Sequence, residues 1–256
     1  MSQRPERPLT GADILPADRP DAPELTWKAK AADELDEVLG SQHRQVADAT
    51  IDALLEALHH EADMTTQLLG SVGSGPGRLV GLEWRLKSPV SLARKIGTKA
   101  VEKGLTPEQV ARELGDTIRY TVTTDKQTDL VPTLIKTIDT LLANGWTVRE
   151  AEESFVRDNP YKGIHLILSG PTGHRCEVQF HTQAAFVRKQ LGHTDYETYR
   201  DVDKTLEVRL RAFNKSVQLW SVVTTPPGLR QLKELGGVQV KSKKYPPPYG
   251  SEEGQK

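Results

Sequence analysis

Residues 163–182 read GIHLILSGPTGHRCEVQFHT, and this stretch decides which kind of fold the chain can form. Two runs, 162–168 and 175–180, alternate between apolar and polar side chains, and the first begins one residue before this stretch. The residues between them, Ser-Gly-Pro-Thr-Gly at 169–173, have the composition of a tight turn. Because alternation with a period of two is typical of a strand with one buried face, the stretch predicts a β-hairpin.

The segments on either side of the hairpin carry both strand and helix patterns. Strands are predicted at 79–87, 117–123 and 146–156, and helices at 26–39, 45–69, 89–103, 106–114, 129–142, 183–192 and 195–220. Ser88 followed by Pro89 is a typical start for the 89–103 helix, since serine caps the first turn and proline fits its first position. The chain therefore predicts an α+β domain with a mixed β-sheet of about five strands, flanked by helices.

The composition of the chain also suggests how it is divided. Residues 1–23 contain five prolines among scattered charges and are expected to form a disordered tail. N-terminal helices are expected over 24–70, followed by a glycine-rich break at 70–77. The main domain is expected over 78–222. A C-terminal helix and a second disordered tail are expected over 223–256.

Charge and hydropathy exclude several functional classes. The 256 residues include 34 Lys and Arg against 35 Asp and Glu, a net charge of −1, so the protein is not a generally basic nucleic-acid binder. No apolar run approaches the ~20 residues that a membrane helix needs, and the first residues lack a charged-then-apolar leader. The single cysteine excludes an internal disulfide and a cysteine metal cluster. We expect a soluble cytoplasmic protein with no membrane partner.

A group of basic and hydroxyl side chains lies at the start of the 89–103 helix. Lys87, Ser91 and Lys95 are spaced four apart, which places them on one stripe of a helix or its entry. Arg85 precedes Lys87 by two residues and shares its face of the incoming strand. With the free backbone N–H groups of the helix N-terminus, they could hold several phosphates. A solvated basic face is the alternative interpretation.

Two carboxylates stand at positions suited to metal binding. Glu177 shares one strand face with Gln179 and His181, while the apolar Cys176, Val178 and Phe180 share the other. Asp116 stands where a helix gives way to a strand. If the two carboxylates lie on neighbouring strands they could share Mg²⁺, which prefers oxygen ligands and bound phosphates. Alternatively, Glu177 belongs to an ordinary two-faced strand and Asp116 only ends a helix.

A third candidate group alternates along the first strand of the hairpin. Tyr161 and His165 flank Gly163, which leaves a flat space where a base could stack on the tyrosine. In that arrangement His165 could contact a phosphate or a hydroxyl. The alternative is an edge aromatic beside a satisfied polar residue. His59, His60 and His193 have no ligand-like neighbours in the sequence and are predicted to be surface residues.

Four of these segments, in this order, resemble the synthetase domain of the RelA/SpoT family of alarmone synthetases, which has a nucleotidyltransferase-like fold. The segments are 85–95 (RLKSPVSLARK), 114–119 (LGDTIR), 159–165 (NPYKGIH) and 176–182 (CEVQFHT). Together they lie within about 81–182, and the rest of the chain matches only as flanking helices. One departure is Pro160, which stands where the family usually has a glycine before the tyrosine. In style the chain is closest to the small single-domain or toxin-like members.

The resemblance implies an activity and a role for each residue. The family moves the β,γ-pyrophosphate of ATP to the 3′-hydroxyl of an acceptor nucleotide in the presence of Mg²⁺. Carried over by position, the ATP-binding residues would be Arg85, Lys87, Ser91, Lys95 and Arg119. The acceptor-binding residues would be Tyr161, Lys162, His165 and Gln179, with the tyrosine stacked on the base. Asp116 and Glu177 would bind Mg²⁺ and catalyse the transfer, with Glu177 also activating the hydroxyl.

The partners remain open at this point. The acceptor could be GDP or GTP, an adenine nucleotide or, as in toxin-like relatives, the 3′ end of tRNA. The tRNA hypothesis predicts a basic patch on the late helices, and a toxin would have an antitoxin. Small family members are often homo-oligomers. The other hypotheses are a non-catalytic nucleotide-binding module, which would usually have lost one carboxylate, and a nucleotidyltransferase, which would need a carboxylate pair after its Gly-Ser turn.

Overall fold

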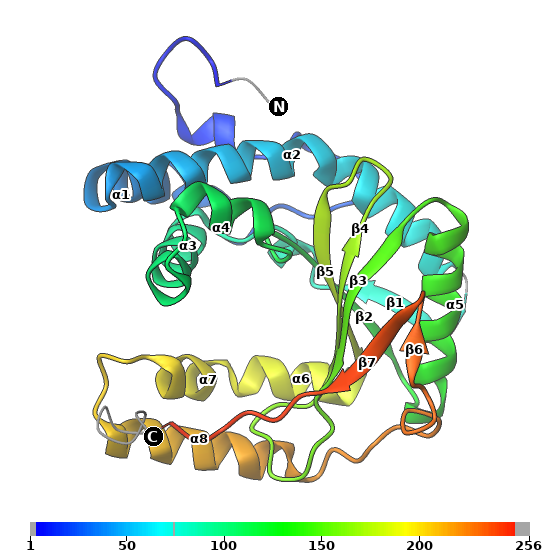
Figure 1. Cartoon of the computed structure of the whole chain (residues 1–256). Coiled ribbons are helices and arrows are strands. Elements are labelled where there is room, and N and C mark those ends of the chain that lie inside the picture. The colour runs from blue at the N-terminus through cyan, green and yellow to red at the C-terminus, as the bar shows by residue number, and fades with distance from the viewer. Residues whose placement is uncertain (1–3, 74, 249–256) are drawn as a thin grey trace.

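The protein is described here by a computed structural model covering residues 4–73 and 75–248. Within these residues, a seven-stranded mixed sheet runs through the centre in the order β1-β2-β5-β4-β3-β7-β6 (Figure 1). The strands are β1 (Gly77–Val80), β2 (Ile118–Thr124), β3 (Thr147–Glu153), β4 (Ile164–Ser169), β5 (Arg175–Thr182), β6 (Glu234–Leu235) and β7 (Val238–Ser242). The pairs β2/β5 and β3/β7 are parallel, and the other neighbours are antiparallel. The α+β class is confirmed, with seven strands where about five were expected.

The predicted hairpin is formed by β4 and β5. Its register pairs Ile164 with Phe180 at one end and Ser169 with Arg175 at the other. The backbone N–H of Gly170 donates to the carbonyl of His174 across the turn, at 2.9 Å. Gly173 has a φ of 86°, a conformation that glycine adopts without strain. The turn is therefore short and well defined.

Helices cover the sheet. They are α1 (Ala31–Ser41), α2 (Arg44–Val72), α3 (Pro89–Lys103), α4 (Pro107–Glu113), α5 (Leu130–Ala143), α6 (Gln183–Leu191), α7 (His193–Arg200) and α8 (Leu206–Ser221). In Figure 1, α1 to α4 lie at the top, α5 lies beside the sheet, and α6 to α8 lie at the bottom. The single helix predicted over 195–220 is in fact two, because the chain turns after Arg200 and Thr205 caps a new helix. None of the described helices combines the length and apolar composition needed to cross a bilayer.

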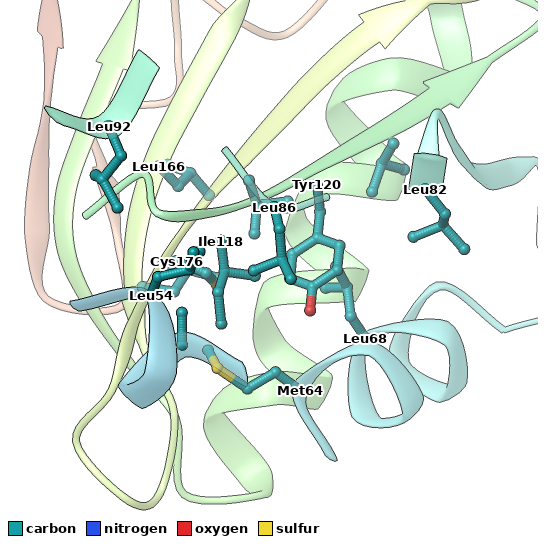
Figure 2. Close-up of a cluster of buried hydrophobic side chains, with 14 of the residues drawn as sticks. Leu54, Met64, Leu68, Leu82, Leu86, Leu92, Ile118, Tyr120, Leu166 and Cys176 are labelled. Atoms are coloured by element: carbon teal, nitrogen blue, oxygen red, sulfur yellow. The ribbon is translucent and has the colours of Figure 1, made fainter. Parts of the chain in front are cut away.

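The main core lies between α2, α5 and one face of the sheet. Figure 2 shows Leu54 and Leu68 of α2 directed toward Ile118, Tyr120 and other apolar side chains from the strands. The labelled side chains in this cluster are buried. Truncating such a leucine to alanine typically costs about 2–5 kcal/mol. Because this face is apolar, the alternate residues of each strand must point to the opposite face.

The N-terminal segment differs from the expected disordered tail over its described part, residues 4–23. Ile14 is fully buried against α1 and α2, and it ends a short 3₁₀ helix, Gly11–Ile14. Arg4 pairs with Asp48 and Asp52 of α2 at 2.9 and 2.7 Å. The apolar anchor explains the difference, because a polar, proline-rich segment can be held in place by one such side chain. Residues 1–3 lie outside the described part.

The C-terminal segment also differs from expectation. A hairpin of β6 and β7 turns at Gly236 and Gly237, both with positive φ, and β7 extends the sheet alongside β3. Beyond it, the N–H of Lys243 donates to the carbonyl of Glu153 at 2.7 Å. The two strands are short and lie on either side of the glycine pair, so their sequence signal is weak. The expected tail at 249–256 lies outside the described residues.

Candidate active site

The polar face of the sheet carries most of the candidate residues. Strand alternation directs Glu177 and Gln179 of β5 to this face, while Cys176 and Val178 enter the core. Arg119 of β2 lies directly beside Glu177 in the parallel register, and His165 of β4 lies opposite Gln179. The predicted strand faces thus bring a carboxylate, a guanidinium and an imidazole together.

A cavity of about 340 Å³ opens on this face. Asp116 and Glu177 both line it, although they come from the α4–β2 junction and from the middle of β5. The other charged side chains in its lining are Lys95, Lys99, Lys103, Glu113, Glu150, Glu152 and Lys243, and His165 lines it as well. The structure therefore brings the two predicted metal ligands into one mixed-charge pocket.

Asp116 has one oxygen bound by lysines and one oxygen free. Its Oδ2 accepts from Lys95 Nζ at 2.6 Å and lies 3.0 Å from Lys87 Nζ. Its Oδ1 is buried and has no hydrogen-bond partner among the described residues. Burial raises the pKa of Asp116, but the charges of Lys87 and Lys95 outweigh it and hold the pKa below its usual value. An ionised carboxylate oxygen that accepts no hydrogen bond can serve as a ligand for a cation.

The two lysines are positioned by the start of α3. Ser88 caps the helix by accepting from the backbone N–H of Ser91, and Pro89 occupies its first position, as predicted. Lys95 follows one turn after Ser91 on this helix. Burial and the nearby charges of Arg119 and Lys95 lower the pKa of Lys87, although Asp116 acts against them. Several cationic groups therefore share this corner, and Asp116 is their counterion.

Glu177 is held by two polar neighbours. Its Oε1 accepts from His165 Nδ1 at 3.0 Å and its Oε2 accepts from Gln179 Nε2 at 2.7 Å. The Gln179 Oε1 in turn accepts from Lys189 Nζ of α6 at 2.6 Å. Burial raises the pKa of Glu177, but these contacts with His165 and Gln179 hold it well below its usual range. Glu177 is therefore an oriented, ionised carboxylate at the cavity wall.

Tyr161 is placed differently from the exposed stacking surface that the sequence suggested. Its hydroxyl lies 2.6 Å from His165 Nε2 and 2.7 Å from His181 Nε2, and its ring packs against Trp220 with centroids 5.0 Å apart. Because an ionised carboxylate can only accept, His165 Nδ1 donates to Glu177, and the Tyr161 hydroxyl bridges the Nε2 atoms of His165 and His181. Burial raises the pKa of Tyr161 and lowers that of His181 well below its usual value. Tyr161 is thus the centre of a buried hydrogen-bond chain behind Glu177.

Arg85 does not join the cavity. Gly81 has a φ of 68° and ends β1, so a 3₁₀ turn at Leu82–Trp84 replaces the predicted strand and redirects the chain. The Arg85 side chain is 2% exposed and its Nε donates to Glu61 Oε1 of α2 at 2.8 Å. Its Nη1 donates to the carbonyls of Pro23 and Leu82. In this structure Arg85 forms a buried ion pair, not part of the phosphate site.

Of two further predicted residues, Lys162 is directed elsewhere and Arg119 stays beside Glu177. Lys162 Nζ donates to the carbonyl of Val223 at 2.8 Å, which directs it away from Glu177. Arg119 stays beside Glu177, and its Nη2 donates weakly to the carbonyl of Trp84 at 3.5 Å. Its Nε is buried without a partner among the described residues. Arg119 therefore has hydrogen-bonding capacity left for a ligand.

The structure adds residues that the motifs did not single out for this site. Lys189 reaches it from α6, although the sequence suggested it only for a basic patch. Lys99 and Lys103 continue the stripe of Lys95 at four-residue spacing and line the same cavity. That spacing was a usable signal. Glu152 and Lys243 pair at 2.6 Å across β3 and the C-terminal segment, a contact that no local pattern predicts.

Comparisons with known proteins find matches among solved structures alone. No family model and no curated protein matches the chain. It is similar to small alarmone synthetase 1 from Bacillus subtilis, at 17% identity and a TM-score of 0.46, over 67% of this chain and 89% of that one. It is similar to the Type VI effector Tas1, solved with its immunity protein, at 17% identity and a TM-score of 0.44, over 68% and 95%. A GTP pyrophosphokinase family protein from Streptococcus pneumoniae is similar at 17% identity and a TM-score of 0.40, over 68% and 86%.

Proposed function

We propose that the protein is a pyrophosphokinase that transfers the β,γ-pyrophosphate of ATP to the 3′-hydroxyl of a nucleotide. The observation that carries the proposal is the shared cavity of Asp116 and Glu177, with Lys87 and Lys95 on one oxygen of Asp116. A degenerate, non-catalytic copy of the fold would not be expected to keep both carboxylates ionised at one cavity. The four sequence motifs support the same reaction.

The charges of the site suit a triphosphate. ATP carries about four negative charges, and phosphoryl-transfer sites depend on positioning and charge stabilisation more than on covalent chemistry. Lys87 and Lys95 share Asp116 Oδ2 as a counterion, which leaves an excess of positive charge. When ATP binds, the two ammonium groups turn to its phosphates and release Asp116 Oδ2. Together with the unpartnered Oδ1, this leaves a carboxylate ready to hold a cation.

Asp116 and Glu177 are the residues that would hold Mg²⁺. Mg²⁺ takes oxygen ligands, usually one or two carboxylates with substrate phosphates, and both residues offer ionised oxygens to the cavity. Bound there, the ion would neutralise charge on the transferred group. Arg119, beside Glu177 and with its Nε unpartnered, can contact the phosphates from the β2 side.

The reaction balances with the groups present. The acceptor 3′-oxygen attacks the β-phosphorus of ATP, the bond between that phosphorus and the oxygen bridging to the α-phosphorus breaks, and AMP leaves. Glu177 takes the hydroxyl proton. Glu177 is ionised at neutral pH, so the hydroxyl meets a carboxylate. His165, fixed between Glu177 and Tyr161, keeps that carboxylate oriented.

A free nucleotide is the acceptor that the surface favours. The tRNA alternative needs an uncompensated basic patch on α6 to α8. Arg211 pairs there with Glu207 at 2.8 Å, and Lys215 lies 4.0 Å from Asp195. Lys204 likewise lies 4.0 Å from Asp201, whereas Arg188 and Arg209 donate to backbone carbonyls, so the basic side chains here are compensated in part. We therefore propose GDP, GTP or an adenine nucleotide as acceptor. A neutralising protein partner and a homo-oligomer stay predictions from the family resemblance.

Labelled ATP distinguishes this reaction from related ones. The protein is incubated with Mg²⁺, a panel of GDP, GTP, AMP, ADP and bulk tRNA, and ATP labelled at either the α- or the γ-phosphate. We expect α-label in AMP and γ-label in the acceptor. Release of ADP instead of AMP would indicate a simple kinase, and α-label in the acceptor would indicate a nucleotidyltransferase. Either result would refute the proposal.

A further inference from the structure

A second group of ligating side chains lies where α2 meets the turn between β4 and β5. Figure 1 shows this turn reaching up to α2, at the top of the sheet. Glu56 and His60 are one helical turn apart on α2, and His174 comes from the turn. None of the three lines the cavity that holds Asp116 and Glu177. The group is therefore separate from the candidate active site.

The donor atoms of these three side chains already lie close together. One ligand atom from each of Glu56, His60 and His174 lies within 4.8 Å of the others. His60 Nε2 is 4.0 Å from Glu56 Oε1, and the His60 and His174 rings are stacked with centroids 4.8 Å apart. Two imidazoles and a carboxylate converging from two elements form a ligand set of the kind that transition metals use.

The surroundings of the histidines leave nitrogen atoms available. His174 Nε2 is buried and has no hydrogen-bond partner among the described residues. Thr172 Oγ1 lies 3.3 Å from His60 Nδ1, so it can accept the proton of that nitrogen and leave Nε2 to ligate. The unpartnered nitrogen of His174 and the Nε2 of His60 are therefore the donor atoms available to an ion.

We propose that Glu56, His60 and His174 bind a divalent transition-metal ion, with Zn²⁺ as the species that fits best and water in the fourth position. Imidazole nitrogens favour Zn²⁺ over Mg²⁺, which prefers oxygen ligands. Zn²⁺ bonds of about 2.0–2.1 Å place tetrahedral ligands about 3.4 Å apart. Binding therefore draws the three donor atoms together by about 1 Å, through side-chain torsions that have broad minima.

Such an ion would join two parts of the chain that are far apart in sequence. It would fasten α2 to the turn that connects β4 and β5, the strands that carry His165 and Glu177. The expected consequence is greater stability, because an ion that binds the folded chain stabilises it by mass action. Saturation at a hundred times Kd should raise Tm by roughly 5–10 °C for a chain of this size.

The test is Zn²⁺ titration of the tag-free full chain by calorimetry, in excess Mg²⁺ to occupy oxygen sites. We expect one Zn²⁺ per chain. His174→Ala and His60→Ala should weaken binding by about 100-fold, and Thr172→Val by about tenfold, as expected when a positioning contact is lost. His59→Ala is the matched control, because His59 is the exposed neighbour on α2, and Glu177→Gln should also keep full affinity.

Cobalt provides a second readout that does not depend on the variants folding well. Co²⁺ bound to the wild-type chain should give the visible absorption of a four- or five-coordinate nitrogen and oxygen site, and Zn²⁺ should abolish it stoichiometrically. The proposal is overturned if the wild-type chain binds no Zn²⁺ in excess Mg²⁺, if it gives no such spectrum, or if folded His174→Ala binds as tightly as wild type. Neither readout depends on whether the protein transfers pyrophosphate.

Discussion

Arg85 gives the sharpest contrast between the sequence motif and the structure. By resemblance it would hold ATP, yet its guanidinium is 2% exposed and pairs with Glu61, which is 1% exposed, at 2.8 Å. Removing one partner of a buried pair typically costs about 3–5 kcal/mol. Without Arg85, Glu61 would keep the longer contact of its Oε1 with Arg19 Nη2, at 3.7 Å. We therefore expect Arg85→Met to lower the free energy of unfolding by about this amount. The corresponding fall in Tm is about 6–20 °C.

A double variant isolates the pair itself. Glu61→Leu with Arg85→Met removes both charges, and similar apolar replacements of buried pairs are often neutral. Arg19, which lies 3.7 Å from Glu61, keeps its 2.8 Å contact with Asp21. Thr65, which donates to Glu61 at 2.6 Å, keeps Tyr120 as a partner at 2.8 Å. Most of the lost stability should therefore return in the double variant. Urea unfolding followed by tryptophan fluorescence measures all three proteins.

Lys87→Met provides the matched comparison. Its ammonium group lies at the cavity corner, 3.0 Å from Asp116, so its loss should raise the KM for ATP and change stability less than Arg85→Met. The reasoning is refuted if Arg85→Met leaves the urea midpoint unchanged and raises the KM for ATP as Lys87→Met does. That result would place Arg85 at the nucleotide, as the motif alone implies.

Three further outcomes follow from the site. Lys95→Met removes an ammonium group that lies 2.6 Å from Asp116. Its loss also removes a charge-assisted hydrogen bond to the phosphates, worth about 1.5–3 kcal/mol, and should raise the KM for ATP about 10- to 100-fold. Lys136→Met on α5 is the control and should leave the KM unchanged. Burial lowers the pKa of Lys189 to about 8, so this cation is present below pH 8 and lost above it. The kcat/KM for the acceptor should fall above pH 8 in the wild type, and Lys189→Arg should remove that fall. If both proteins lose activity above pH 8 alike, Lys189 is not the group that titrates. Tyr161→Phe keeps the ring but removes the hydroxyl that contacts the Nε2 atoms of His165 and His181. Urea unfolding should show that the free energy of unfolding falls by about 1–3 kcal/mol. An unchanged urea midpoint would contradict the hydrogen-bond chain.

Local patterns were sufficient for part of this site. The period of two in the β4–β5 hairpin fixes which face carries Glu177, and the cap at Ser88 with Pro89 fixes where α3 begins. A parallel β2/β5 pair then brings Asp116 near Glu177, because Asp116 lies just before β2. The fold class followed from the same alternation of strand and helix patterns.

Other features depend on contacts between distant segments. Gly81 ends β1 through one positive φ, and this redirects Arg85 from a predicted strand face into the interior. Tyr161 is covered by Trp220 and Tyr245, which come from segments whose position the local sequence does not encode. His60 was predicted to be an isolated surface residue because its neighbour His174 is supplied by the turn of another element.

The central claim is that Asp116 and Glu177 share one divalent ion beside the lysines. Mn²⁺ binding, measured by electron paramagnetic resonance with the α,β-methylene analogue of ATP, tests it without turnover. We expect one tightly bound Mn²⁺ in the wild-type chain, and at least about tenfold weaker binding in both Asp116→Asn and Glu177→Gln. The double variant should be little worse than either single one. Unchanged Mn²⁺ affinity in one of the single variants would show that the two carboxylates do not share an ion.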